Sequence, residues 1–253
     1  MTQKALLAVL LFVASTSALW SQTYSNIDDS TAVDDGLAGA VGWGSCVSCS
    51  GSQGLASIAS SPFQTSPSID GASRDFYING VAYSNGLWWY KVGPNDAVSN
   101  FELDFWVYFN SGTSSAQALE FDSFQFNNGV EYMFGTQCDY ASGTWDVWNA
   151  GAGRWFHTST GCTEFQPNTW YHLTWKFHRT RPDNNEHYDS LTIEQPRKNG
   201  KLSTSTYHFN LTFPSRPMPS GWTDNMGVQF QMDIGATGTT MQEWVDEVTL
   251  TTK

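Results

Sequence analysis

The segment FELDFWVYF, at residues 101–109, carries the clearest structural signal in the chain. Its odd positions are apolar, whereas its even positions hold Glu102, Asp104 and two further aromatic residues. This two-residue period is typical of a β-strand with one buried face. The same period recurs in three later segments, at residues 171–178, 207–213 and 228–234.

Short runs of Gly, Asn, Ser and Thr separate these segments, and the chain beyond residue 18 shows no sustained helical spacing of apolar residues. The sequence therefore predicts an all-β protein, an antiparallel β-sandwich of the jelly-roll type. Residues 74–253 are expected to form the core of this sandwich. Residues 19–73 are rich in Gly, Ser, Ala and Asp, so we expect an irregular segment with one or two short strands, packed on the sandwich as part of the same domain.

Composition excludes some classes of protein. The 253 residues include 24 acidic and 12 basic side chains, which gives a net charge of −12. Nucleic acid is therefore not an expected partner, because phosphate binding depends on clustered Lys and Arg. Aromatic residues make up 15% of the chain and charged residues only 14%, which indicates a folded protein and not a disordered one.

The first residues have the pattern of a signal peptide. Lys4 precedes an apolar run at residues 5–14, and the small residues at 16–18 suit a cleavage site, so residues 1–18 are predicted to be removed. The apolar run is about half of the roughly 20 residues that a membrane-spanning helix needs. We therefore expect a secreted or periplasmic protein without a membrane span, and a monomer.

Four cysteines in an exported chain favour two disulfides. Closeness in sequence favours Cys46 with Cys49 and Cys138 with Cys162, although the sequence alone permits three pairings. The alternative is a four-cysteine zinc site, but the second pair is too widely spaced for one.

The Asn-Gly dipeptide at 128–129 predicts a two-residue β-hairpin turn. Cross-strand partners in such a hairpin have residue numbers that sum to 257. Glu120 is then opposite Gln137, and Asp122 is opposite Gly135. A glycine at that position would leave open space beside the two carboxylates.

Strand geometry places these two acids together on one face. Glu120 and Asp122 point outward, whereas Leu119 and Phe121 point into the core. Gln125 has the opposite parity, and a β-bulge after Asp122 would bring it to the same face.

The sequence ALEFDSFQ, at residues 118–125, resembles the Glu-x-Asp-x-x-Glu strand of the concanavalin A-like glucanases, the relatives of laminarinase, lichenase and the cellobiohydrolases. The resemblance covers about eight residues and implies a concanavalin A-like sandwich. It implies that Glu120 is the nucleophile of a retaining hydrolase and that Asp122 orients it. Gln125 stands where the family has its acid/base Glu, and a carboxamide cannot donate the proton that the leaving oxygen needs.

Other polar and aromatic residues are expected to accompany the acidic pair. Gln229, Gln231 and Asp233 form an alternate polar row on another predicted strand, and Asp146 shares a strand face with Trp148. Amides and carboxylates offer hydrogen bonds to sugar hydroxyls, and indole rings stack on sugar rings. The expected carbohydrate-binding residues, besides Glu120 and Asp122, are Gln125, Gln137, Asp146, Trp148, Gln231 and Asp233.

Three functions are consistent with this pattern. The first is an exported carbohydrate-binding protein that recognises a polysaccharide on a concave sheet. The second is a polysaccharide-cleaving enzyme, with an acid from Asp139, Asp146 or Asp233, or with a lyase base such as Tyr132 or His172. The third is a cell-surface adhesion module, for which the acidic pair would be no more than a solvated strand face.

No complete metal-binding motif is present in the sequence. A structural calcium ion is the one cofactor considered, with Asp246 as a ligand and the acids at 28, 29, 34 and 35 as possible partners. The five histidines lack the spacing of a known transition-metal motif. His172 and His178 are too far apart on one strand to share an ion unless another strand contributes a ligand.

Overall fold

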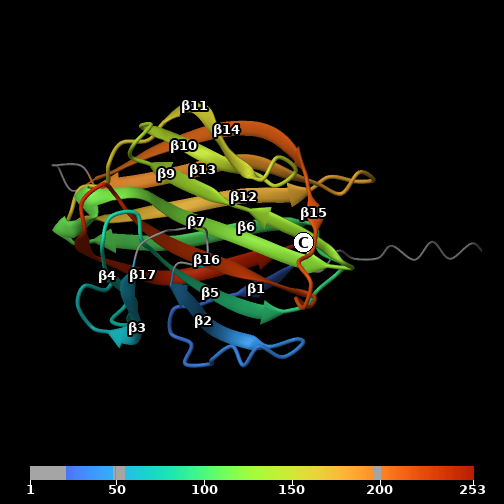
Figure 1. Ribbon diagram of the computed structural model, residues 1–253, viewed down its shortest axis with the longest axis horizontal. Coiled ribbons are helices and arrows are strands. Elements are labelled where there is room, and N and C mark those ends of the chain that lie inside the picture. The colour runs from blue at the N-terminus through green and yellow to red at the C-terminus, as the bar shows by residue number, and fades with distance from the viewer. Residues whose placement is uncertain (1–20, 48, 50–54, 197–200) are drawn as a thin grey trace, which may run out of the picture.

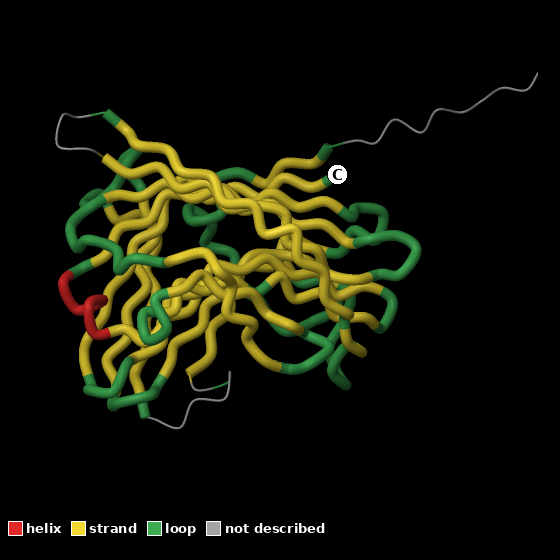
Figure 2. The backbone as a smooth tube through the Cα atoms, turned by 90° about the horizontal axis from the view of Figure 1, so that it is seen from above, coloured by secondary structure: helices red, strands yellow, loops and turns green. Residues whose placement is uncertain are grey.

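The computed structural model describes residues 21–47, 49, 55–196 and 201–253. The predicted signal peptide at residues 1–18 lies outside the described residues. The described chain contains seventeen strands and one 3-10 turn, η1 (Ser111–Ser115), and none of its helices could span a membrane. The strands form two antiparallel sheets packed as a sandwich, which confirms the predicted fold class. Figure 2 shows the two layers edge-on.

The first sheet has nine strands, and the candidate functional site lies on its outer face (Figure 1 shows the sheet). Its strands in spatial order are β11 (Arg154–Gly161), β10 (Thr144–Asn149), β9 (Thr136–Asp139), β7 (Ala116–Asn127), β16 (Asn225–Ile234), β5 (Asn85–Gly93) and β2 (Val41–Val47). Two short strands extend the other end of β7: β8 (Val130–Phe134) pairs with β7, and β15 (Arg216–Pro217) pairs with β8.

The second sheet has eight strands. Their spatial order is β14 (Leu202–Pro214), β13 (Asn185–Pro196), β12 (Trp170–Arg179), β6 (Asn100–Phe109), β17 (Thr239–Thr252), β4 (Ser73–Gly80) and β3 (Ala56–Gln64), and β1 (Gln22–Tyr24) pairs with β17.

The core lies between the two sheets and is rich in aromatic side chains. The odd residues of β6 are buried, as their alternation predicts. Phe105 of β6 packs against Phe121 of β7 and Phe230 of β16, with both pairs of ring centroids 5.3 Å apart. Because β7 and β16 bury their apolar faces here, their polar residues are left on the outer face of the nine-stranded sheet.

The segment at 19–73 contributes strands to both sheets. β1 pairs with β17, β2 with β5 and β3 with β4, so three strands lie in the stretch where an irregular segment with one or two short strands was expected. β2 and β3 are seven and nine residues long despite their small, polar side chains. The partner strand supplies their hydrogen bonds and outweighs their weak local preference.

The hairpin at 128–129 has the predicted register. Asn128 and Gly129 have φ angles of 52° and 76°, the positive values that a tight hairpin turn requires. Glu120 pairs with Gln137, and every partner of β7 in β8 and β9 has a residue number that sums with its own to 257.

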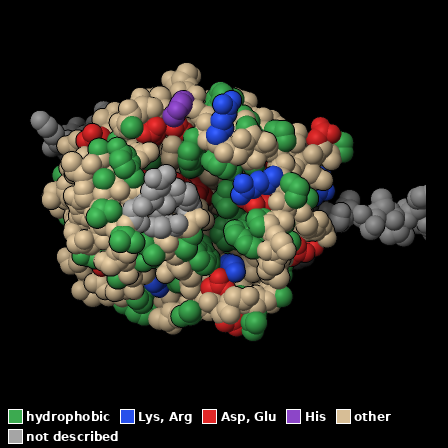
Figure 3. Space-filling view, viewed as in Figure 1, with side chains coloured by type: hydrophobic (Ala, Val, Ile, Leu, Met, Phe, Trp, Pro, Cys, Tyr) green, Lys and Arg blue, Asp and Glu red, His purple; other side chains and the backbone are tan. Residues whose placement is uncertain are grey.

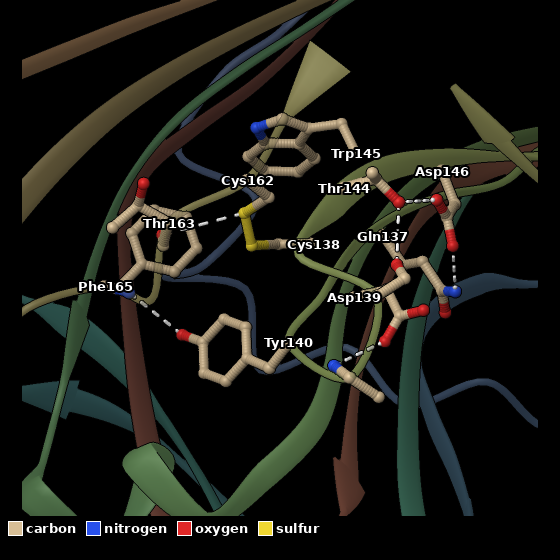
Figure 4. Close-up of a disulfide and its surroundings, with 12 residues drawn as sticks. Gln137, Cys138, Asp139, Tyr140, Thr144, Trp145, Asp146, Cys162, Thr163 and Phe165 are labelled. Carbon is tan, nitrogen blue, oxygen red and sulfur yellow. Dashed lines mark hydrogen bonds between the residues drawn. A yellow bond between two sulfur atoms is a disulfide. The ribbon is translucent and has the colours of Figure 1, made fainter. Parts of the chain in front are cut away.

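The structure joins Cys46 to Cys49 and Cys138 to Cys162, the pairing favoured from sequence. All four cysteines are used in these pairs, so none remains for the alternative zinc site. Figure 4 shows the second disulfide on the core side of β9, with Trp145. Gln137 and Asp146 point to the opposite side.

Candidate functional site

A groove of about 760 Å³ lies on the outer face of the nine-stranded sheet. The face shown in Figure 3 is hollowed near its centre, with acidic side chains inside the hollow. The floor comes from β7, β9 and β16, and Trp148 of β10 and Trp155 of β11 form one wall. Asn85 of β5 lines the groove beyond β16, whereas Met133 of β8 and Arg216 of β15 line it on the other side of β7.

A row of polar residues runs from the floor toward the β11 edge of the sheet, and its members Gln231, Glu120 and Gln137 line the groove, whereas Asp146 and His157 lie beyond the lining. Gln231, Glu120, Gln137, Asp146 and His157 are successive register partners on β16, β7, β9, β10 and β11. Gln231 Nε2 donates to Glu120 Oε1, and Gln137 Nε2 donates to Asp146 Oδ2 at 3.0 Å. Amides and carboxylates thus alternate across the sheet, each held by its neighbour.

A shorter second row lies beside the first. Gln229 of β16 is the register partner of Asp122 and donates from Nε2 to Asp122 Oδ2 at 2.7 Å. The backbone N–H of Thr136 donates to the other oxygen, Oδ1, at 2.7 Å. Asp122 is therefore fixed in place, and its side chain still borders the groove.

Asp233 brings a third carboxyl group to this floor. A hydrogen bond joins it to Glu120, and Gln231 Nε2 donates to Asp233 Oδ1 at 2.9 Å. Burial, together with Asp233 and Asp122, raises the pKa of Glu120 well above its usual range. Burial also raises the pKa of Asp122 to about 8 and that of Asp233 to about 6. Three neighbouring acids cannot all ionise in one buried cluster, so the cluster retains at least one proton near neutral pH.

Two tryptophans form a wall of the groove. Trp148 and Trp155 pack edge to face, with ring centroids 5.4 Å apart. Trp145 is buried in the core, which confirms that the two faces of β10 separate Trp145 from Trp148. The space beside Gly135 is narrower than expected, because a Cβ there would lie only 2.9 Å from Trp148 Cβ. The glycine lets the indole approach the floor.

Asp139, Asp146 and His157 gather at the β9–β11 end of the polar row. His157 Nδ1 is 2.8 Å from Asp146 Oδ2 and 3.9 Å from Asp139 Oδ2. Ligand atoms of the three residues lie within 4.8 Å of one another, so they could hold a metal ion. Thr144 Oγ1 also donates to Asp146 at 2.7 Å, so Asp146 already has three partners without one (Figure 4).

Gln125 does not join the groove, contrary to expectation. β7 keeps one continuous register from Ala118 to Asn127 against β9 and β8, so the expected bulge after Asp122 does not form. Gln125 therefore points to the opposite face, where its Nε2 donates to Asn95 O at 2.8 Å. The even residue Phe124 takes the groove side of the strand instead and stacks on Phe126 at 5.0 Å.

The two proposed lyase bases also lie elsewhere. Tyr132 is 2% exposed and belongs to the core. His172 lies on the eight-stranded sheet, where it contacts Asp104 at 2.9 Å and Glu194 at 3.2 Å. Neither side chain borders the groove.

Asp246 is fully buried at the expected calcium position. Its Oδ2 accepts hydrogen bonds from Ser68 Oγ at 2.8 Å and from the Ile69 N–H at 2.5 Å. Its Oδ1 and the Oδ1 of nearby Asp29 are buried without a hydrogen-bond partner among the described residues, and these are donors that calcium prefers. Asp34 is not part of this group, because it pairs with Lys91 at 2.8 Å.

Several groove residues were not expected from the sequence. Asn85 of β5 is hydrogen-bonded to Asp233. Arg216 of β15 lines the groove and binds Glu131 at 2.6 Å, and Met133 of β8 lines it as well. Arg216 belongs to a two-residue strand, and no pattern in the sequence signals it. Trp155 had a signal, because it follows the Trp-rich strand β10 across a short turn.

No family model and no curated protein matches the sequence. Solved structures do resemble the fold. Arcelin-5, a lectin-like defence protein from Phaseolus vulgaris, has a TM-score of 0.47 at 11% identity, covering 92% of this chain and 98% of its own. A PL-14 alginate lyase from Aplysia kurodai has a TM-score of 0.48 at 11% identity, covering 78% and 87%. A family 11 carbohydrate-binding module from Clostridium thermocellum has a TM-score of 0.37 at 13% identity, covering 92% and 95%. These are likenesses of architecture.

Proposed function

We propose that this chain is an exported carbohydrate-binding protein that recognises a polysaccharide in the groove of the nine-stranded sheet. The observation that carries the proposal is the polar row from Gln231 through Glu120 and Gln137 to Asp146, with Trp148 beside it. Paired amides and carboxylates suit vicinal sugar hydroxyls, which both donate and accept. The indoles offer an apolar surface to the face of a sugar ring.

The shape of the groove supports an extended ligand. The side chains that line the groove come from six neighbouring strands, β5, β16, β7, β9, β10 and β11. At about 4.8 Å per strand the lining extends for roughly 24 Å, which accommodates several sugar units in a row. The floor is acidic, and Arg216 is the basic side chain on the lining. A neutral glycan fits this charge better than a polyanionic one does.

A second candidate is cleavage of the glycan in the same groove. It is favoured by Glu120, whose raised pKa keeps a proton available near neutral pH, as a general acid requires. The position of the second carboxyl group does not fit a retaining mechanism. Asp233 is hydrogen-bonded to Glu120, whereas a retaining pair needs carboxyls about 5 to 5.5 Å apart across the bond to be cleaved. Gln125, at the family's acid/base position, faces away from the groove.

Affinity electrophoresis against β-glucans, xylan, alginate and pectin tests the proposal. One neutral glycan is expected to retard the chain, and Glu120→Ala is expected to remove the retardation. Glu102→Ala is the matched control, because Glu102 is a strand carboxylate on the other sheet, paired with Lys176 at 3.1 Å. Retardation by none of the glycans would support the adhesion module instead.

The same panel separates binding from cleavage. Release of reducing sugar by the wild type, abolished by Glu120→Gln, would identify an enzyme. Retardation without any release, lost in Glu120→Ala, would support binding alone.

A further inference from the structure

We propose that His178, His187 and Asp189, on the outer face of the eight-stranded sheet, form a binding site for a late first-row divalent metal ion such as Zn²⁺. The site lies on the opposite layer from the groove and does not depend on carbohydrate binding. Ligand atoms of the three side chains lie within 4.8 Å of one another. Two imidazoles and one carboxylate are a donor set that this class of ion prefers.

The strand pairing brings the two histidines together. His178 of β12 and His187 of β13 are register partners, although eight residues of strand and turn lie between them in the sequence. Their ring centroids are 4.4 Å apart. From the sequence, His178 was considered only together with His172, and the closeness of His178 to His187 was not expected.

A β-bulge places the carboxylate between the two rings. On the β12 side, Phe177 pairs with Tyr188 and Lys176 with Ser190, so Asp189 has no partner there. The pairing of β13 with β14 also shifts at this position. Bulges of this kind redirect a side chain and are common at functional sites. Asp189 lies two residues after His187 and therefore shares its outer face, and its carboxylate also contacts His178.

The distances agree with those around a bound ion. His178 Nδ1 is 2.9 Å from Asp189 Oδ2, and His187 Nε2 is 3.6 Å from Asp189 Oδ1. Ligands about 2.0 to 2.1 Å from a tetrahedral ion lie about 3.3 Å from one another. The 3.6 Å separation is too long for a hydrogen bond. Small side-chain rotations would therefore complete three-ligand coordination and leave one position open to water.

A supporting contact orients His187. Its Nδ1 lies 2.6 Å from Thr212 Oγ1 on β14. We assign the proton of the neutral ring to Nδ1, where it donates to Thr212, so that the lone pair of Nε2 is directed toward Asp189. Histidine ligands commonly donate their second ring N–H in this way. The side chains of His178, His187 and Asp189 are 31%, 17% and 36% exposed, so an ion can reach them from solvent.

The test is calorimetric titration of the untagged, chelator-treated full chain with Zn²⁺. One ion per chain is expected, and His178→Gln, His187→Gln and Asp189→Asn are each expected to weaken binding at least about tenfold. Thr212→Val should weaken it by about tenfold through the loss of the supporting contact. His208→Gln, at an exposed histidine of β14, is the control and should bind as the wild type does. Intense visible absorption of the Co²⁺ form should accompany binding and disappear in His187→Gln.

Three results would overturn the site. One is no Zn²⁺ uptake by the wild type, and another is unchanged uptake in His187→Gln. The third is loss of uptake in Asp139→Asn but not in Asp189→Asn, which would place the ion at the cluster of Asp139, Asp146 and His157. Circular dichroism shows whether each variant is folded. The glycan should retard His187→Gln as much as it retards the wild type. The metal titration and the retardation assay therefore test the metal site and the proposed function separately.

Discussion

Glu120 and Gln231 are register partners on neighbouring strands, and Gln231 Nε2 donates to both Glu120 Oε1 and Asp233 Oδ1. A single amide therefore holds two buried acids that are also hydrogen-bonded to each other. Burying like groups together costs stability, because the folded chain must retain a proton that the unfolded chain releases. Such a cost is typical of a site retained for binding and not for stability.

Glu120→Gln should make the protein more stable at high pH. The folded pKa of Glu120 is raised above its unfolded value of about 4.3. At low pH both states hold the proton, so wild type and variant should be similar. As pH rises past about 4.3, the wild type loses stability at up to about 1.4 kcal/mol per pH unit until the folded pKa, and the variant avoids this loss. Urea unfolding at about pH 4 and pH 8 measures the difference.

The glutamine also keeps an N–H that can donate to Asp233. The control is Asp183→Asn, at an exposed loop carboxylate. A variant that gained no stability between the two pH values would show that Glu120 is ionised in the folded protein.

Trp148 and Trp145 should respond oppositely to truncation. Trp148→Ala should lower affinity for the retarding glycan at least about tenfold, or about 1.4 kcal/mol, because it removes a wall of the groove. Trp145→Ala should destabilise the fold by about 3 to 5 kcal/mol, because that indole is 1% exposed in the core. Affinity electrophoresis and urea unfolding of both variants make the comparison. Equal glycan affinity in Trp148→Ala and wild type would remove the indole from the binding site.

Local sequence signals predicted the β7 hairpin because a two-residue turn fixes its own register. Asn128 and Gly129 set the turn, and the alternation of β7 set the faces of Glu120 and Asp122. The prediction for Gln125 was wrong because it assumed a β-bulge after Asp122. The alternation of residues along a strand does not show whether a bulge is present. The continuous register therefore had to be seen in the structure.

Sequence patterns did not predict which strands, distant in the sequence, pair with each other. Gln231 lies 111 residues from Glu120, and both belong to amphipathic strands that could have paired with many others. The sequence predicted the polar row of β16. It did not predict that β16 lies beside β7, which the strand order of the sheet shows. The same limit applies to His178 and His187, which meet only because β12 and β13 pair.

Asp246 provides a test of the calcium expectation. Its Oδ1 and the Oδ1 of Asp29 lack hydrogen-bond partners among the described residues, so a bound calcium ion would satisfy both. A chelator should then lower the melting temperature by several degrees, and excess Ca²⁺ should restore it. Asp246→Ala should destabilise the fold by about 1 to 3 kcal/mol with or without calcium, because the N–H of Ile69 and the hydroxyl of Ser68 lose their acceptor. A melting temperature unaffected by the chelator would argue against the ion and leave the hydrogen-bonding role intact.

Glu243 is a buried acid that does not line the groove. Its substitution therefore measures the stability cost of burying a carboxyl group without changing the groove. Glu243 lies on β17 between its register partners Phe76 and Phe109, is fully buried, and has no hydrogen-bond partner for either oxygen among the described residues. Burial raises the pKa of Glu243 well above the usual range of a glutamate.

Glu243→Met should therefore stabilise the protein, and by more at about pH 8 than at about pH 4, because the unfolded wild type releases this proton above about pH 4.3. The gain at pH 8 should exceed about 1.4 kcal/mol, the equivalent of one pH unit. Urea unfolding measures it, with exposed Glu164→Gln as the control. Glycan retardation should stay at the wild-type level, because Glu243 does not border the groove. A loss of stability at both pH values would mean that the carboxyl group has a partner in the folded protein, since only a satisfied polar group is costly to replace by an apolar one.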